Sequence, residues 1–299
     1  MLKGAISTCL PSEWPISMLA AAGTEPQRLA WEYPPSVFPG MDAQTIWSRA
    51  NSTVEEFDSK CPEKGRVFVS GDPLVTPLIV ALLQERGYVP VEAIVDTSLQ
   101  WRLLPNGSYE SSYMHEVKGF RPFTRHEKPI PPDQWRSPLL PIEISISEYW
   151  VQDWPDTMIE SCGVASRADI LEIPFPRIET DVAMRPHEGT YALLVDAKVN
   201  YLVEIISYNR PMRCGVFVMG NSLAMTVALV ERLQEQGFCP FGACFSDFTH
   251  TRVAPYGTTE RVLEKQFAGF LPYPGIREPR PISRWWNHPQ GCFPPTICD

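Results

Sequence analysis

The segment Gly220-Asn221-Ser222 follows a short apolar run, Val216 to Met219, and precedes a longer aliphatic stretch. This order is typical of a β-strand that turns directly into an α-helix. Glycine lets a ligand approach the backbone closely, and the free N–H groups at a helix N-terminus attract phosphate. The segment is therefore a candidate anion-binding turn. The alternative is that Asn221 only caps the helix and Gly220 only permits the turn.

The same pattern occurs earlier in the chain as Ser70-Gly71-Asp72, after the run Val67 to Val69. Here an aspartate stands where a phosphate would bind, and its carboxylate favours plain capping of the helix. We therefore expect any phosphate site to differ between the two copies of the pattern.

Two arginines, Arg102 and Arg252, occupy the same position in related segments that each contain a Gly turn. The planar guanidinium group suits a phosphate or a carboxylate. The alternative is a salt bridge across a β-hairpin, to Glu110 and Glu260 respectively. The sequence leaves both interpretations open.

Parallel sheets bind ligands at the carboxyl ends of their strands. The candidate ligand-binding residues are those predicted at such ends, together with the two arginines. They are Ser7, Gly71, Asp72, Thr97 and Arg102 in the first half, and Ser147, Gly220, Asn221, Ser222, Ser246 and Arg252 in the second. No residue is assigned a catalytic role.

Several well-known catalytic patterns do not occur in the sequence: the Walker A loop, GxGxxG, HExxH and GxSxG. The five histidines are dispersed, and only His250, beside Thr251 and Arg252, is a candidate for acid–base chemistry; the alternative is a surface histidine. The eight cysteines lack the paired close spacing of zinc or redox sites. We predict no metal and no cofactor.

The net charge of −9 argues against long nucleic acid as a partner, although a small anionic ligand stays compatible with it. Pro11, Glu13 and Pro15 interrupt the start of the chain where a signal peptide would be apolar. The longest apolar run, residues 78–83, is too short to span a bilayer. We expect a cytoplasmic protein with reduced cysteines and no membrane partner.

The candidate residues recur because the chain contains an internal duplication. Residues 87–123 align without a gap with residues 237–273, and Pro90/Pro240 and Phe120/Phe270 are among the identical pairs. Trp14-Pro15 and Trp154-Pro155 also repeat, and we interpret them as packing features that anchor a helix. The repetition predicts two similar units within one chain.

Each unit is predicted to alternate strands and helices and to end in a β-hairpin. Strands are expected at 5–8, 29–33, 67–69, 91–95 and 142–146, a hairpin at 99–104 and 109–120, and helices at 16–22, 42–58, 191–208 and from Asp72-Pro73 to Gly87. The predicted helix at 191–208 carries a broad apolar stripe, which contains Leu193, Leu194, Val199, Leu202, Val203 and Ile206.

The predicted fold class is α/β, with two tandem Rossmann-like units, each a mainly parallel sheet with a C-terminal β-hairpin, arranged as a pseudo-dimer. Unit one comprises residues 1–123, a Pro-rich linker 124–141, unit two 142–273, and a Pro- and Trp-rich extended tail 274–299. The tail contains six prolines with Trp285 and Trp286, and we expect it to lie as a strap across the units.

The order of strands, helices and turns that the two units share is clearest in unit two. It is seen there in Ile173-Pro-Phe-Pro176, Val216 to Gly220, Leu229 to Leu233, and Gly237. Ala243, Arg252, Gly257-Thr258, Phe267 and Phe270 complete it. This order resembles the small Rossmann-like proteins found beside type III CRISPR systems, relatives of CARF domains and stand-alone ring nucleases. The resemblance spans nearly the whole chain, once per copy.

The resemblance implies that a cyclic oligoadenylate binds in a groove between two such units, in antiviral signalling, with metal-independent cleavage of the ring as a further activity. It also implies an acidic residue after the strand-end glycine, which is Asp72 in unit one but Asn221 in unit two. The alternatives are a non-enzymatic component that binds a protein partner through its tail, and an unrelated small-molecule enzyme on the same scaffold.

Overall fold

The computed structural model describes residues 1–38, 40–103, 109–123, 141–176, 188–210, 214–220, 222–253 and 259–275. For residues 97–103, 109–115, 188–190, 247–253 and 259–265 it describes the backbone alone. Within these ranges the chain forms two five-stranded sheets with the strand orders β2-β1-β3-β4-β5 and β10-β9-β8-β6-β7. The chain is therefore an α/β protein of two Rossmann-like units, as predicted.

In unit one the strands are β1 (Leu2–Ser7), β2 (Ala30–Glu32), β3 (Arg66–Ser70), β4 (Val89–Leu103) and β5 (Tyr109–Pro122). The α-helices are α1 (Ile16–Ala22), α2 (Ala43–Lys60) and α3 (Thr76–Glu85), with short 3-10 turns at Pro11–Glu13 and Pro26–Arg28. The first four strands are parallel, and β5 returns antiparallel to β4.

Unit two repeats this arrangement with β6 (Ile142–Ser147), β7 (Leu171–Pro174), β8 (Gly215–Met219), β9 (Cys239–Val253) and β10 (Thr259–Pro272). Its α-helices are α4 (Asp156–Ser161), α6 (Glu188–Asn209) and α7 (Leu223–Glu235), with 3-10 turns at Val151–Asp153 and Arg167–Asp169. Only β10 is antiparallel to its neighbour.

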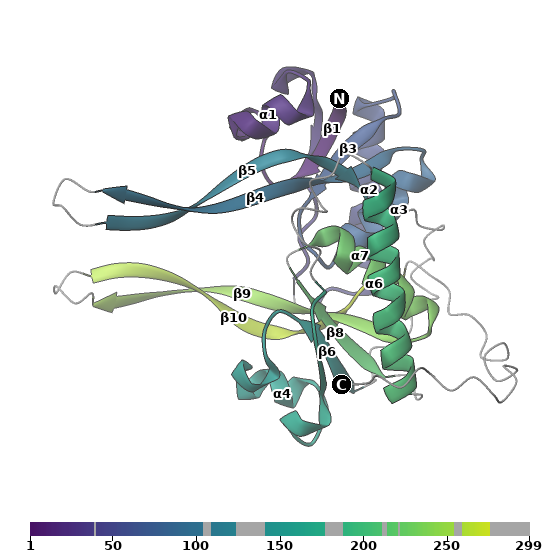
Figure 1. Cartoon of the computed structure of the whole chain (residues 1–299), viewed down its shortest axis with the longest axis vertical. Helices are drawn as coiled ribbons and strands as arrows, with labels where there is room; N and C mark the ends of the chain where they lie inside the picture. Colours follow the sequence, from purple (N-terminus) through teal and green to yellow (C-terminus); the bar gives the residue numbers. More distant parts are fainter. Residues whose placement is uncertain are drawn as a thin grey trace, which may run out of the picture.

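The two sheets bury their inner faces in one common core. Val67 and Val69 of β3 belong to the same buried cluster as Val216 and Val218 of β8, together with buried residues of α2, α3, α6 and α7. Figure 1 shows the resulting pseudo-dimer, in which both hairpins project to the same side of the molecule. The units are thus joined by packing as well as by the chain.

The outer face of each sheet has a smaller core beneath a short helix. Trp14, before α1, packs edge-on against Phe68 with ring centroids 5.5 Å apart. Trp154, before α4, packs against Phe217 at 5.1 Å in the same way. The repeated Trp-Pro pairs are therefore the helix anchors that the sequence predicts. Gly23, with a φ of 66°, ends α1 at the expected position.

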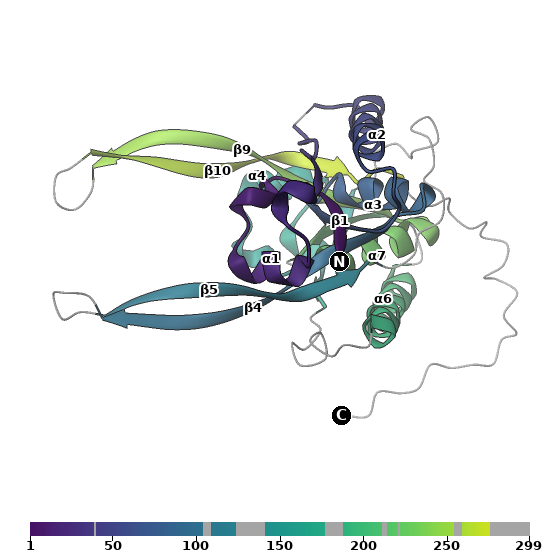
Figure 2. The same ribbon diagram turned by 90° about the horizontal axis from the view of Figure 1, so that it is seen from above.

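The sequence predicts two separate strands at 91–95 and 99–104. In the structure they are one strand, because β4 runs unbroken from Val89 to Leu103. The intervening Asp96-Thr97-Ser98 contains no proline or glycine to stop the strand, and β5 pairs with it throughout. We call the parts of the hairpins beyond Ala93 and Ala243 arm one and arm two. Each arm extends well past the remaining strands of its sheet (Figure 2).

Two helix predictions need correction. The helix after Asp72-Pro73 begins at Thr76, because residues 73–75 form a turn and Pro77 occupies the second helical position. In α6 the buried positions are Tyr191, Val195, Val199, Val203 and Ile206. Leu193 is not among them: it is 71% exposed, so the predicted single stripe mixes two helix faces.

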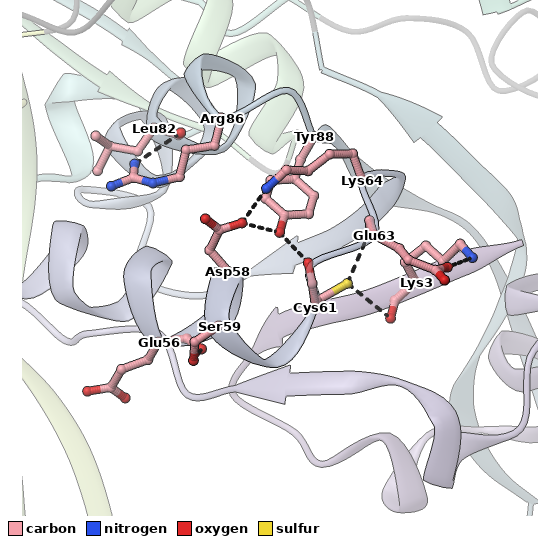
Figure 3. A network of polar contacts seen from close by, with 10 residues as sticks. All are labelled: Lys3, Glu56, Asp58, Ser59, Cys61, Glu63, Lys64, Leu82, Arg86 and Tyr88. Atoms are coloured by element: carbon pink, nitrogen blue, oxygen red, sulfur yellow. Dashed lines mark hydrogen bonds and ion pairs between the residues drawn. The ribbon is translucent and has the colours of Figure 1, made fainter.

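The amino-terminal edge of sheet one is held by a polar network (Figure 3). The Tyr88 hydroxyl donates to Asp58 Oδ1 at 2.5 Å and contacts the carbonyl of Cys61, while Lys64 lies 4.2 Å from the Tyr88 ring centroid. Unit two has Phe238 in the place of Tyr88, with the same backbone hydrogen bond to the preceding helix. The network therefore supports the end of α2 in unit one and is not a common feature of the fold.

Candidate functional site

The carboxyl ends of the central strands β1, β3, β6 and β8 all face the side from which the arms project (Figure 1). This follows from the parallel pairing of β3 with β4 and of β8 with β9, since β4 and β9 continue past these ends into the arms. The predicted strand-end residues of both units are therefore brought to one face of the molecule.

Ser7 and Ser147, at the ends of β1 and β6, are 2% and 6% exposed. The Ser7 hydroxyl donates to the carbonyl of Cys9 at 2.6 Å, and the Ser147 hydroxyl donates to the carbonyl of Tyr149. Both serines close the turn that follows their strand, so their hydroxyls are already engaged in hydrogen bonds that stabilise the fold.

The strand-end glycines are required for packing. A Cβ on Gly71 would lie 2.8 Å from Cγ of Pro34, and one on Gly220 would overlap the ring of Phe175. In each unit the loop after the second strand occupies the space beside the glycine. The space beside each glycine, through which a ligand was expected to approach the backbone, is thus filled by side chains of the protein itself.

The turns that lead into α3 and α7 are closed by different side chains. Asp72 accepts the N–H of Leu74 at 2.9 Å and the N–H of Val37 at 3.0 Å. In unit two, Ser222 is the N-cap of α7 and accepts the N–H of Met225 at 3.3 Å. Asn221 lies outside the described residues.

A carboxylate from unit one also caps the helix of unit two. Glu92 of β4 is 5% exposed, and its carboxylate accepts the N–H of Ala224 at 2.9 Å. It also pairs with Arg121 of β5, whose guanidinium lies 3.9 Å from the ring centroid of Tyr191 on α6. This inter-unit cluster, Glu92–Arg121–Tyr191–Ala224, fixes how the two units meet.

Sequence reasoning missed this cluster. The signal that it offered is a difference between the copies, because Glu92 stands where unit two has Gly242. A Cβ on Gly242 would lie 2.5 Å from Leu74 of unit one, so an apolar contact replaces the carboxylate on that side. The two halves of the interface therefore use different chemistry at equivalent places.

Two hollows lie where strand ends of one unit meet the helix start of the other. One, of about 370 Å³, is lined by Ser7, Glu92, Ala93, Val95 and Leu223 among others. The second, of about 390 Å³, is lined by Asp72, Leu74, Gly220, Ala243 and Phe245 among others. Leu223 and Leu74 are equivalent residues that each enter the hollow of the opposite unit.

Within the described lining, the charged side chains of both hollows are carboxylates: Glu13 and Glu92 in the first and Asp72 in the second. Tyr273 in the second hollow donates to the carbonyl of Val218 at 3.2 Å, and burial, with the nearby charge of Asp72, raises its pKa. Burial likewise raises the pKa of the Cys244 thiol. The carboxylates of Glu13, Glu92 and Asp72 therefore set the charge of the hollows, and they disfavour an anion there.

Four predicted site residues lie on the arms. Phe68 pairs with Val91, so Ser70 is level with Ala93. At about 3.3 Å per residue, Arg102 lies roughly 30 Å farther along arm one, and Arg252 has the equivalent place on arm two. Thr97 and Ser246 are nearer the strand ends, and the Ser246 hydroxyl donates to the carbonyl of Gln266 at 3.5 Å.

The backbone register sets Arg102 opposite Glu110 and Arg252 opposite Glu260. This is the register that the salt-bridge interpretation requires. The structure thus gathers Ser7, Asp72, Ser147, Gly220 and Ser222 near one face and places the two arginines far from them.

No protein-family profile matches the chain, and no curated protein matches it in sequence. None of the helices in the described ranges has the length and apolar character needed to cross a bilayer. In the same ranges, no three His, Cys, Asp or Glu side chains are grouped so that they could hold a metal ion.

We predict that Gly220→Ala lowers the free energy of unfolding by about 1–3 kcal/mol, because the new methyl group forces the Phe175 ring to move. Urea unfolding measures the loss, and adding Phe175→Leu should recover part of it. The matched control is Gly119→Ala, whose Cβ would lie 4.0 Å from Ile94. Equal effects of the two alanines would contradict the packing role of Gly220.

Glu92→Ala should destabilise the chain by about 3 kcal/mol, since it leaves Arg121 and the Ala224 N–H without their buried partner. Arg121→Ala in the same background should add less than it costs alone. Glu116→Ala, which removes the exposed partner of Lys118, is the control and should have a much smaller effect. Denaturant unfolding that ranks Glu116→Ala above Glu92→Ala would refute the inter-unit role.

Burial and the charge of Glu92 raise the pKa of Tyr191 to about 12. The folded state therefore holds this proton more tightly than the unfolded state, whose tyrosines titrate near 10. Stability from Tyr191 is fully present below about pH 10 and is lost as the pH rises toward 12, by up to about 1.4 kcal/mol per pH unit. Tyr191→Phe should flatten this decline in urea unfolding at pH 9 to 11.5.

The control for loss of a hydroxyl is Tyr208→Phe, at a side chain that is 77% exposed. An alkaline decline that is equally steep in the wild type and in Tyr191→Phe would show that Tyr191 does not contribute to it.

Proposed function

We propose that this chain binds a cyclic oligoadenylate between the two arms, which project from the face where the strand ends of both units meet. The observation that supports this is the pseudo-dimer itself, with two related sheets directing their carboxyl ends and arms to one side. A ring-shaped ligand with repeated nucleotides matches a receptor made of repeated halves. The CARF-like resemblance points to the same ligand class, by analogy of fold.

The phosphates of such a ligand would lie away from the starts of α3 and α7. Asp72 and Glu92 already occupy N–H groups there, and their negative charge opposes a second anion. Arg102 and Arg252, on the arms, carry the complementary charge and are the residues that we propose to bind phosphate. The ligand would then lie farther out than the strand-end turns.

The proposal is limited to binding. At the strand ends, Ser7, Ser147 and Ser222 each engage in a hydrogen bond of the fold, so they are poor candidates for orienting a ribose hydroxyl or a phosphate. Cleavage of the ring by a 2′-hydroxyl would need groups on the arms to do this. In keeping with this ligand class, we propose a cytoplasmic role in antiviral signalling.

A second candidate function is that of a non-enzymatic, protein-binding component. It is favoured by the carboxylates that line the two hollows and by apolar side chains at the base of the arms. Val95 and Phe245, at equivalent positions of β4 and β9, are 44% and 39% exposed. Such a site would suit an apolar protein segment better than a phosphate.

The experiment is titration of the full chain with cyclic tri-, tetra- and hexa-adenylate, with binding measured by calorimetry and by melting temperature. A ring at 100 times its Kd should raise the melting temperature by roughly 5 °C. Arg102→Ala with Arg252→Ala should weaken binding at least tenfold, whereas Arg28→Ala, whose exposed side chain pairs with Glu25, is the control.

Absence of binding by all three rings would overturn the proposal. If, in addition, a protein partner bound the chain and this binding were lost on Phe245→Asp, the second candidate would replace it. Chromatography of the incubated ligands separates binding from cleavage, because only cleavage yields linear products.

A further inference from the structure

Helix α6 has a second apolar stripe on its outer face. Leu193, Tyr201 and Tyr208 are 71%, 58% and 77% exposed, and Ala197 and Ile205 complete the row at helical spacing. The opposite face carries the buried Val195, Val199, Val203 and Ile206. The helix therefore has one apolar face for the core and another that the core does not use.

The sister helix α2 shows that the fold does not require this outer stripe. Its buried Ile46, Ala50, Val54 and Phe57 correspond in order to the buried row of α6. In the same alignment, the outer stripe of α6 corresponds to five exposed polar residues of α2, which are Gln44, Ser48, Ser52, Glu56 and Ser59. The two helices lie on opposite edges of the molecule (Figure 2). The edge formed by α6 is therefore apolar on its outer face, whereas the edge formed by α2 is polar.

The size of the stripe limits what can cover it. With about 200 Å² for a tyrosine side chain, its exposed residues present on the order of 400 Å². A stable interface between separate proteins buries about 800 Å² per partner. A segment tethered to the same chain needs less, because its effective concentration is already high. The stripe therefore suits a tethered segment better than a second copy or a free protein.

The segment that follows unit two has suitable chemistry. Residues 276–299 contain Trp285, Trp286 and several prolines, a composition that docks on aromatic side chains such as those of Tyr201 and Tyr208. They also contain three arginines, whereas the whole chain carries a net charge of −9.

The segment also starts in the right place. Gln234 of α7 donates to the carbonyl of Pro274 at 2.8 Å, and α7 packs against α6. Residues 276–299 can extend over about 80 Å, which exceeds the roughly 33 Å length of α6. The chain therefore leaves unit two one helix away from the stripe and is long enough to follow it.

We propose that residues 276–299 dock along the outer stripe of α6, with their aromatic and proline side chains against Leu193, Tyr201 and Tyr208. This docking is independent of the cyclic oligoadenylate proposal, because α6 does not contribute to the two hollows. It gives the tail a binding site on its own chain.

The first test places a photo-crosslinking benzoyl-phenylalanine at position 201 of the full chain, and at the equivalent position 52 of α2 as the control. After irradiation at low protein concentration, mass spectrometry of the digest should find position 201 joined to a peptide within 276–299 of the same molecule. No such product should form from position 52. A crosslink only between two copies, or none to the tail, would overturn the proposal.

The second test replaces the stripe with the residues of the sister helix, as Leu193→Gln, Tyr201→Ser and Tyr208→Ser. The fold should be retained, which circular dichroism checks, because α2 carries these polar residues at the same positions. Trypsin should then cleave after Arg284 about tenfold faster than in the wild type, since the tail is released. An unchanged cleavage rate in the folded variant would also overturn the proposal.

Discussion

The structure depends on the burial of two sheet faces in one common core. Each sheet face needs an apolar cover: α2 and α3 pack on sheet one, α7 packs on sheet two, and α3 packs against α7 so that the two covers merge. Neither unit has a complete inner core without the other, so the duplication produced one folded body. This shared core also fixes the direction of the strands, which is why both sets of carboxyl ends and both arms lie on one side.

Duplication gave the two units similar backbones, but their side-chain contacts diverged, including at the interface between the units. Glu92 faces the start of α7 with a carboxylate, whereas the equivalent Gly242 makes room for Leu74. Divergence also occurs within a unit, because Tyr273 donates a hydrogen bond to the carbonyl of Val218 in unit two, whereas its counterpart in unit one is the buried Phe123. A copy inside one chain is free to diverge in this way, because no symmetry forces both halves of the interface to be identical.

Local signals in the sequence predicted most of the fold. Gly23 ends α1, Trp14 anchors it, and alternating strands and helices indicate two parallel sheets, all of which rest on neighbouring residues. The inter-unit cluster could not be predicted in this way, because Glu92 and Ala224 are far apart in the sequence and meet only after both units fold. The same limit explains why Leu193 was wrongly assigned to the buried stripe, since helical spacing identifies apolar stripes but not which of two stripes is buried.

The strand ends show why a candidate site and a folding requirement are hard to separate in a sequence. Glycine beside a helix start is what a phosphate needs, but it is also what Phe175 and Pro34 need in order to pack. In unit one, the Asp72 carboxylate accepts the N–H of Leu74 in the turn before the helix and, by its charge, disfavours the phosphate. Because both requirements are met within the chain, the strand-end turns of this protein contribute mainly to stability. Residues that the core does not use, on the arms and on the outer face of α6, are therefore the ones left for recognition.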